Sequence, residues 1–218
     1  MRRINGIGQV VVSVAAALTA GSLAWADPAA EEAQPGTAAE QAQPSPLKPH
    51  PHPVVVMETS KGTITAELWP DKAEATVANF LSYTDEEFYD GLVFHRVIDG
   101  FMIQGGGFTA KMEQRTPGPP IKNEARKDVP NTRGTVAMAR ARDADSATSQ
   151  FFINVVDNHN LNHRDKTARG YGYCVFGKVI DGMDVVDAIA KVPTVTRGPY
   201  KNVPREPVRI ISVRRRTE

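Results

Sequence analysis

From residue 54 onward the sequence is a succession of short runs rich in β-branched residues, and this pattern restricts the fold more than any other feature. The runs 54–59 and 63–68 flank Ser60-Lys61-Gly62, which predicts a β-hairpin. Six further strands are expected at Val93–Ile98, Phe101–Gln104, Gly134–Met138, Gln150–Val155, Cys174–Val179 and Val208–Val213. Many short antiparallel strands favour a closed barrel or a sandwich, and the pattern alone does not choose between them.

Two segments carry apolar residues at helical spacing, 73–83 and 183–191. Asp71 lies just before the first and is a candidate N-cap. Residues 105–131 are rich in proline and glycine and predict a long loop. The apolar positions that define the two helical faces are Val77, Phe80, Leu81, Val185, Val186 and Ile189.

Residues 1–26 have the features of a secretory signal peptide. Arg2 and Arg3 give a positive start, residues 10–23 are apolar but diluted by small residues, and 24–26 read Ala-Trp-Ala. The apolar stretch is shorter than the roughly 20 residues of a spanning helix, so we expect cleavage and export to a bacterial periplasm; an uncleaved anchor is the alternative. Residues 27–53, rich in Pro, Ala, Glu and Gln, predict a disordered tether, and 54–218 the folded domain.

Composition narrows the function classes. A hydrophobic content of 41% with 23% charged residues is typical of a globular protein, and a net charge of +1 does not call for nucleic acid as a partner. Cys174 is the only cysteine and lies in an apolar run, so we expect a packed thiol without a disulfide. His50 and His52 alternate with prolines, and His159 and His163 lie among loop residues, so no metal site is expected.

The run from Phe94 to Gly107, FHRVIDGFMIQGGG, carries the most specific chemistry. It places Arg96 among large apolar residues and contains no nucleophile. No lysine, serine or threonine follows the three glycines at the spacing of a phosphate-binding loop. A permanently charged planar donor beside an apolar pocket suits a reaction that stabilises a polar transition state without covalent bonds to the protein.

Together with Gly134–Val155, GTVAMARARDADSATSQFFINV, this run resembles the signature of the cyclophilin-type peptidyl-prolyl cis-trans isomerases. The resemblance extends over about residues 54–213. It implies a mainly β fold, a closed eight-stranded antiparallel barrel capped by two α-helices. It also implies an enzyme that needs no cofactor and no metal, and we expect a monomer.

The resemblance assigns roles to individual residues. Arg96 would donate to the amide nitrogen, and Gln104 would bind the substrate backbone and orient Arg96. The pocket for the proline ring would be lined by Phe101, Met102, Phe152 and Leu161. Tyr173 would add a flat wall where many relatives have histidine. The groove for residues that precede the proline would be lined by Ala139, Arg140, Ala141 and Gln150.

Strand alternation places two other residues away from the site. Phe151 is expected in the core because it neighbours Phe152, and His95 is expected to be a packed histidine with satisfied hydrogen bonds. Asn160 stands where many eukaryotic relatives have tryptophan, which predicts weak cyclosporin binding. Arg140 stands where relatives often have asparagine, which predicts a changed preference for the residue before proline.

The function predicted is isomerisation of X-Pro bonds in unfolded or partly folded exported polypeptides, which assists their folding. The alternative is a non-catalytic module or chaperone that binds proline-containing segments in the same groove. A hydrolase is disfavoured because Ser146 and Ser149 lack a G-x-S-x-G context and Cys174 lacks a thiol-protease context. We expect neither nucleic acid as a partner nor stable membrane insertion after signal cleavage.

Overall fold

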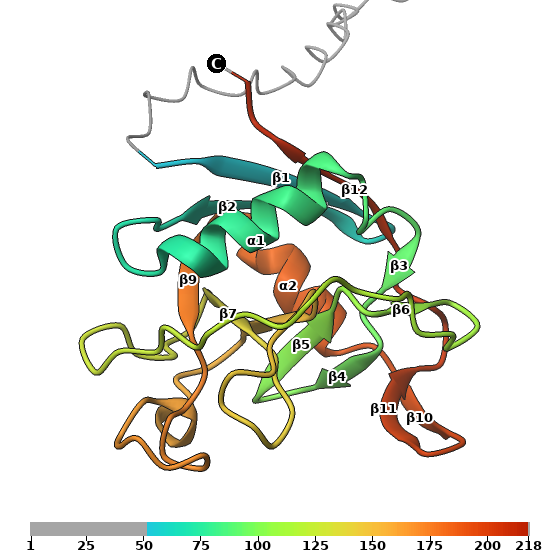
Figure 1. Cartoon of the computed structure of the whole chain (residues 1–218). Coiled ribbons are helices and arrows are strands. Elements are labelled where there is room, and N and C mark those ends of the chain that lie inside the picture. The colour runs from blue at the N-terminus through green and yellow to red at the C-terminus, as the bar shows by residue number, and fades with distance from the viewer. Residues whose placement is uncertain (1–51, 218) are drawn as a thin grey trace, which may run out of the picture. The chain divides into compact units, whose positions relative to one another are not determined.

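The structure, a computed structural model, describes residues 52–217, and eight of its strands form one antiparallel sheet (Figure 1). Neighbouring strands follow the order β12-β1-β2-β9-β7-β8-β5-β4. Each of the eight strands predicted from the sequence overlaps one of them, so the mainly β prediction is confirmed. Their bounds are β1 Val54–Thr59, β2 Gly62–Leu68, β4 Arg96–Ile98, β5 Met102–Gly105, β7 Thr135–Met138, β8 Phe151–Asn154, β9 Val175–Asp181 and β12 Ile210–Arg215.

The sheet curls into an open half-barrel, whereas the resemblance implied a closed barrel. The edge strands β4 and β12 do not form a ladder, because the strand predicted at 93–98 breaks at Phe94 and His95. Its first part, β3 (Leu92–Val93), pairs with β6 (Phe108–Thr109) in a separate small sheet. Two backbone hydrogen bonds join the residues on either side of β3 to the chain at the start of β12, from Gly91 N to Ile210 O at 2.9 Å and from Phe94 N to Val208 O at 3.0 Å.

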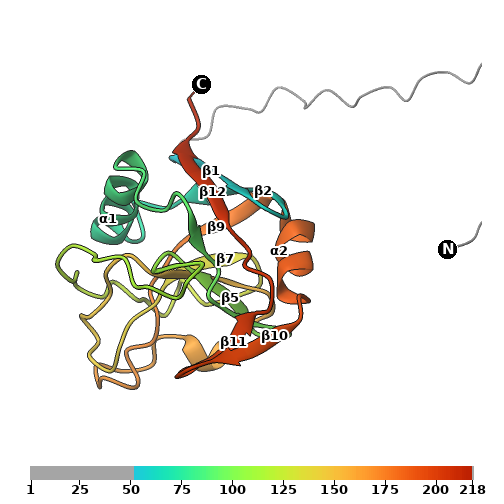
Figure 2. The same ribbon diagram turned by 90° about the vertical axis from the view of Figure 1, so that its right-hand side faces the viewer.

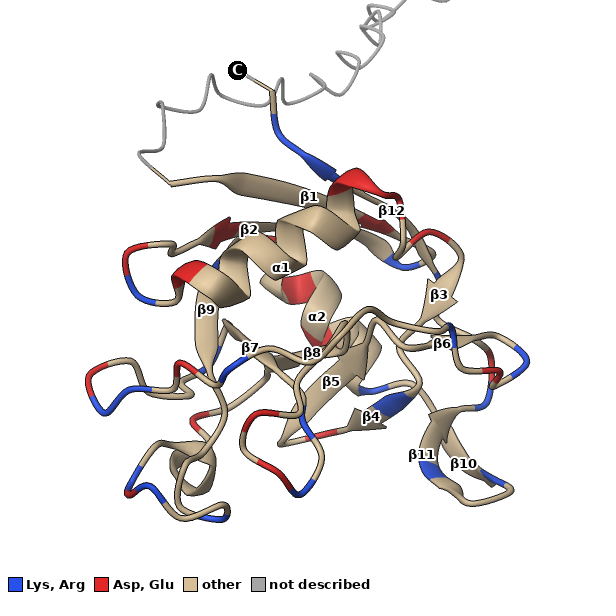
Figure 3. Cartoon of the chain, viewed as in Figure 1, with Lys and Arg blue, Asp and Glu red and all other residues tan. Residues whose placement is uncertain are grey.

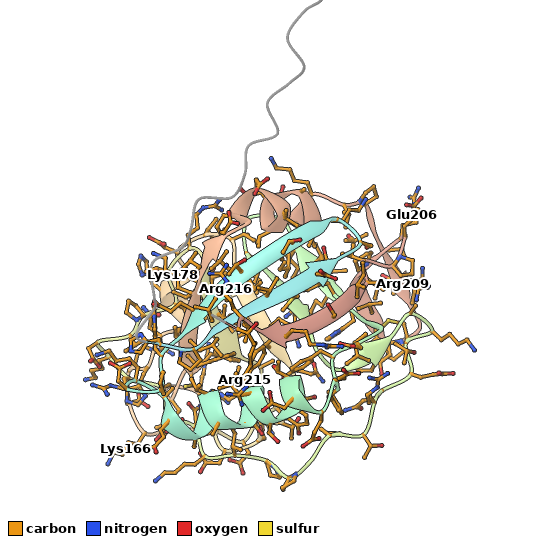
Figure 4. All side chains as sticks on the ribbon, turned by 90° about the horizontal axis from the view of Figure 1, so that it is seen from above. Lys166, Lys178, Glu206, Arg209, Arg215 and Arg216 are labelled. Carbon is orange, nitrogen blue, oxygen red and sulfur yellow. The ribbon has the colours of Figure 1, made fainter. Side chains whose placement is uncertain are left out.

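Helices α1 (Glu74–Asp85) and α2 (Met183–Ala190) lie on opposite sides of the curled sheet (Figure 2). Helix α1 buries all three apolar residues predicted for its inner face, whereas α2 buries Val186 and Ile189 but leaves Val185 half-buried. The ion pair between Arg215 and Asp85 joins the end of β12 to the end of α1, and Figure 4 shows Arg215 beside that helix. Within residues 52–217, no helix has the length and apolarity to cross a bilayer.

The prediction that Asp71 caps α1 is wrong. The N-cap residue is Ala73, which has no side chain to accept a hydrogen bond. Glu124 takes over this task from the long loop: its carboxylate accepts hydrogen bonds from Ala75 N at 3.2 Å and from Thr76 N at 2.8 Å. A carboxylate near the first turn also interacts favourably with the helix dipole. The long loop therefore fixes the start of α1, although the two are 48 residues apart in the sequence.

The core fills the concave side of the sheet, and strand alternation separates it from the outer face. Phe151 on β8 is fully buried and packs edge-on against Phe80 and Tyr89, at 5.5 Å between ring centroids in each pair. Phe151 therefore belongs to the core, as predicted. Phe152, its neighbour, belongs to a second cluster on the other face, with Met102, Ala137 and Val175.

Four elements were not predicted, and one of them, β6, lies within the segment 105–131 that was expected to be a loop. The strands β10 (Thr194–Arg197) and β11 (Tyr200–Pro204) form a separate hairpin, and η1 (His159–Leu161) is a single 3-10 turn. The predicted signal peptide, 1–26, and nearly all of the predicted tether, 27–53, lie outside the described residues.

Candidate active site

The outer face of four neighbouring strands carries a row of directly opposed residues. Arg96 on β4 pairs with Gln104 on β5, Gln104 with Phe152 on β8, and Phe152 with Ala137 on β7. Because side chains in opposed positions of an antiparallel sheet point to the same face, this register puts a cation, an amide and an aromatic ring side by side. The residues between them along each strand, such as Phe151 and Ile103, point into the core.

Arg96 is half-buried and held by a chain of side-chain contacts. Its Nη1 donates a hydrogen bond to Gln104 Oε1 at 3.4 Å, and Gln104 Nε2 donates to Gln150 Oε1 at 3.0 Å. The bond to Gln150 fixes which end of the Gln104 amide faces Arg96. The Arg96 guanidinium carbon also lies 5.9 Å from the centroid of the Phe101 ring. No other hydrogen bond of the Arg96 side chain occurs within residues 52–217, so most of its donors are free for a ligand.

A cavity of about 100 Å³ lies beside Arg96. Nine of the eleven residues that the sequence assigns to the site line this cavity together, while their individual roles stay predictions. Two aromatic rings form its inner walls, since Phe152 and Tyr173 meet edge-on at 5.6 Å between centroids. The lining residues are Arg96, Phe101, Met102, Gln104, Ala139, Arg140, Phe152, Leu161 and Tyr173.

A second cavity, of about 290 Å³, continues from the first and contains the residues predicted for the groove. Gln104, Ala139 and Arg140 line both cavities, so a polypeptide chain can pass from one to the other. The remaining predicted residues, Ala141 and Gln150, line the second cavity only. Its other walls, which the sequence did not indicate, are Gln114, Ser146 and Thr148.

Arg140 lies against Tyr173, with its guanidinium carbon 4.9 Å from the ring centroid. Its Nε donates to Gly172 O and its Nη2 to Ala168 O, both at 2.8 Å. Its Nη1 donates to Ala141 O at 3.1 Å. These bonds occupy the guanidinium with backbone carbonyls, so Arg140 fixes the wall of the site and is not a free cation.

Comparison with known proteins decides the family. Residues 54–215 match the family model described as "Cyclophilin type peptidyl-prolyl cis-trans isomerase/CLD". The chain belongs to the cyclophilin family. A relative from Acinetobacter baylyi, named "Peptidyl-prolyl cis-trans isomerase", is 57% identical over 160 residues, 73% of this chain and 84% of the relative. "Peptidyl-prolyl cis-trans isomerase B" of Escherichia coli is 54% identical over 160 residues, 73% of this chain and 98% of the relative.

The fold agrees with a solved cyclophilin. The crystal structure of a cyclophilin-type peptidyl-prolyl cis-trans isomerase from Cryptosporidium parvum superposes with a TM-score of 0.64 at 24% sequence identity. The match covers 77% of this chain and 99% of that chain. This cyclophilin therefore has the fold that the resemblance implied, except that β4 and β12 do not pair with each other to close the barrel.

A network of buried asparagines supports the pocket of this cyclophilin, and the sequence analysis missed it. Asn158 Nδ2 donates to Phe101 O at 2.9 Å and to Asn154 Oδ1 at 2.7 Å. Asn131 Nδ2 donates to Leu161 O and to Tyr173 O, each at 3.2 Å. The network thus holds the backbone of three pocket residues. Its only signal in the sequence is the presence of asparagines in apolar surroundings, as in FFINVVDN.

Burial shifts the pKa of two groups near the site. His95 is buried and packs against Phe108 at 4.6 Å between centroids, as expected of a packed histidine. Its Nδ1, however, has no hydrogen-bond partner within residues 52–217, so the expected satisfaction is incomplete. Burial lowers the pKa of His95 from 6.5 to about 4 and raises that of the Cys174 thiol from 9.0 to about 11. Neither group is suited to acid–base or nucleophilic chemistry at neutral pH.

Proposed function

We infer that this protein is a peptidyl-prolyl cis-trans isomerase in which Arg96 is the catalytic residue. The observation that carries this inference is a guanidinium with free donors, held by Gln104 at the edge of a small cavity that Phe101, Met102 and Phe152 help to line. Membership of the cyclophilin family supports the reaction class. The substrates are proline-containing segments of unfolded or partly folded polypeptides.

The reaction needs no covalent bond to the protein. Rotation about a peptide bond has a barrier of roughly 18–20 kcal/mol, because the nitrogen lone pair is shared with the carbonyl. In the twisted amide that lone pair is localised on nitrogen and accepts a hydrogen bond. Arg96 is placed to donate this bond while the aromatic and aliphatic walls hold the proline ring. The arginine remains protonated throughout, so the step transfers no proton.

The Gln104 amide contributes by restricting the arginine. With Nε2 bound to Gln150, Gln104 presents its oxygen to Arg96 Nη1 and keeps the guanidinium over the cavity. A donor that is fixed before the reaction stabilises the transition state without reorganisation at the moment of rotation. Phe101 and Phe152 exclude water around this bond and so strengthen it.

The test is cis–trans exchange of a short X-Pro peptide, measured by NMR for the wild-type protein and for Arg96→Ala. Loss of one preorganised donor typically costs about 100-fold to 1,000-fold in rate, so we expect a fall of about 100-fold with peptide affinity largely retained. Arg126→Ala removes an exposed arginine paired with Asp128 and serves as the control with unchanged rate. Peptide binding without acceleration by the wild-type protein would instead identify a non-catalytic proline-binding module.

We also propose that this isomerase is exported to a periplasm and acts there as a monomer. The positive start, the apolar stretch and the Ala-Trp-Ala end of residues 1–26 support export. Expression of the full chain in a bacterium tests this: the periplasmic protein should begin at Asp27. A protein that retains Met1 and stays with the membrane would indicate an uncleaved anchor. Light scattering measures the molar mass in solution, and a mass twice that of one chain would contradict the monomer.

The curled sheet, we further propose, behaves as a closed barrel in solution. The hydrogen bonds from Gly91 N and Phe94 N, on either side of β3, to Ile210 O and Val208 O support this proposal, because they join the chain just before β4 to the chain at the start of β12. Hydrogen exchange measures it directly. Amide protons of Gly91 and Phe94 protected as strongly as that of Ile153 in β8, which is paired on both sides, would agree with closure, and exchange as fast as in exposed loops would contradict it.

A further inference from the structure

A large cavity with arginine walls adjoins the candidate proline pocket. Its volume is about 630 Å³, and it shares Leu161, Tyr173 and Arg140 with the small cavity beside Arg96. The shared wall is thin, because it consists of the Tyr173 ring with the Arg140 guanidinium stacked on it. The arginines that line the large cavity are Arg140, Arg142, Arg164 and Arg169, and no Asp or Glu lines it.

Three of these arginines have free head groups. Arg140 is bound to backbone carbonyls, but the guanidinium groups of Arg142, Arg164 and Arg169 are exposed and make no hydrogen bond or ion pair within residues 52–217. They come from two loops, one after β7 and one between η1 and β9. Figure 3 shows both basic and acidic residues on these loops, and the acidic ones do not line the cavity.

The carboxylates closest in sequence are occupied elsewhere. Asp165 Oδ1 accepts hydrogen bonds from Thr167 N at 2.9 Å and from the Thr167 hydroxyl, and these bonds, together with Arg164, lower the pKa of Asp165. Asp143 Oδ1 accepts from Asp145 N at 3.1 Å. Neither carboxylate lines the cavity, and although Asp165 lies near Arg164, none of the three free arginines forms an ion pair within residues 52–217.

We propose that this arginine cavity is a substrate subsite for an acidic side chain, Asp or Glu, within about three residues of the isomerised proline. An extended chain advances by about 3.3–3.6 Å per residue, so a segment whose proline sits beside Arg96 reaches past the Tyr173 wall within that distance. The proposal rests on the proposed function, because it takes the small cavity as the proline site. The positive potential of the cavity would select acidic segments among otherwise similar ones.

An acidic polypeptide fits these observations better than nucleic acid. The whole chain has a net charge of only +1, whereas proteins that bind nucleic acid usually carry a strong basic excess. The cavity also adjoins the pocket for an amino-acid ring, across the wall of Tyr173 and Arg140, rather than a long basic groove.

The experiment compares peptides that carry Glu or Gln at each of the three positions on either side of a single proline. Exchange NMR gives kcat/KM for each peptide with the full-length wild-type protein and with the triple variant Arg142→Gln, Arg164→Gln, Arg169→Gln. The control variant Lys61→Gln, Lys111→Gln, Lys166→Gln removes the same charge from exposed lysines outside the cavity. Lys166 belongs to the same loop as Arg164 but lies at the outer edge of the molecule in Figure 4.

Exposed ion pairs typically contribute about 0.2–1 kcal/mol each, so we expect a Glu-to-Gln ratio of kcat/KM of about five at the best position. The ratio should fall to about one in the arginine variant, stay near five in the lysine control, and decrease in high salt. A ratio near one at every position, with the Gln peptides still accelerated, would overturn the subsite and leave the isomerase intact. Failure to accelerate any peptide would overturn the isomerase itself. Binding of a single-stranded oligonucleotide that the arginine variant abolishes, without a preference for Glu, would replace the acidic peptide by nucleic acid.

Discussion

Replacing Asn131 by alanine is expected to destabilise the protein and to weaken catalysis, although Asn131 does not line the proline pocket. The side chain is fully buried and makes three hydrogen bonds. It donates to Leu161 O and Tyr173 O and accepts from Asn154 Nδ2. Alanine removes all three and fills none of the space.

The size of the loss in stability depends on which hydrogen bonds the three partners of Asn131 retain. Leu161 O still accepts from Tyr173 N at 2.9 Å, and Asn154 Nδ2 still donates to the Thr135 hydroxyl at 2.9 Å. Tyr173 O loses the hydrogen bond from Asn131 and has no other within residues 52–217. At about 0.7 kcal/mol for each of the three bonds and about 1 kcal/mol for one unsatisfied carbonyl, the free energy of unfolding falls by about 3 kcal/mol. For a domain of this size that lowers Tm by about 6–12 °C.

Catalysis is affected because the freed carbonyls belong to two walls of the pocket. A shift of the Leu161 and Tyr173 backbones loosens the grip on the proline ring, so we expect kcat/KM to fall by about tenfold. Urea unfolding measures the stability and exchange NMR the rate. The control is Thr84→Val, which removes one buried hydrogen bond, from the Thr84 hydroxyl to Phe80 O at 2.9 Å, in helix α1 and far from the site. That variant should lose about 1 kcal/mol and keep its kcat/KM.

Two results would refute this reasoning. A loss of less than 1 kcal/mol in Asn131→Ala would mean that water or a rearranged side chain replaces the network. A loss of about 3 kcal/mol with kcat/KM unchanged would mean that the network contributes to stability but does not position the pocket.

Three further predictions follow from buried or capping groups. The pKa of His95 in the folded protein is lowered from 6.5 to about 4, so its contribution to stability is complete above pH 6.5 and is lost as the pH falls towards 4. Between pH 7 and pH 4.5 the free energy of unfolding should therefore fall less for His95→Phe than for the wild type, as measured by urea unfolding at each pH. The pKa of the Cys174 thiol in the folded protein is raised from 9.0 to about 11, so the free energy of unfolding should decrease as the pH rises from 9 to 11. At pH 8 a thiol reagent should label Cys174 no faster than the protein unfolds. Rapid labelling of the native protein would contradict the burial of this thiol. Glu124→Ala removes the carboxylate that caps α1 and should cost about 1–2 kcal/mol in urea unfolding, whereas an unchanged midpoint would show that solvent caps the helix equally well.

The strands could be predicted because their signal is local. A period of two puts Phe151 in the core and Phe152 on the outer face, and the structure has both there. The β10–β11 hairpin lacks that signal, because β10 alternates between exposed and half-buried residues and has little apolar surface to bury. The break of the predicted strand 93–98 also depends on a distant partner, since β3 pairs with β6 about 15 residues later.

The site residues were predicted by resemblance rather than by pattern. Leu161 and Tyr173 lie outside the strands of the sheet, and only the path of the chain brings them to Phe152. The asparagine network was missed for the same reason. Asn131 and Asn154 are 23 residues apart, and no spacing rule connects a loop residue to a strand residue at that separation. The arginine cavity likewise requires two loops to meet, which the sequence of neither loop reveals.

The alternation of Phe151 and Phe152 on β8 has a consequence for how this protein can change over time. Substitutions at outward positions of the sheet alter substrate preference while the interior stays as it is, so new specificities are accessible one residue at a time. An insertion or deletion of a single residue within β8 has the opposite effect, because it exchanges the two faces along the strand. We therefore expect natural and laboratory variants to differ by substitution within β8 and by length only in the loops around it.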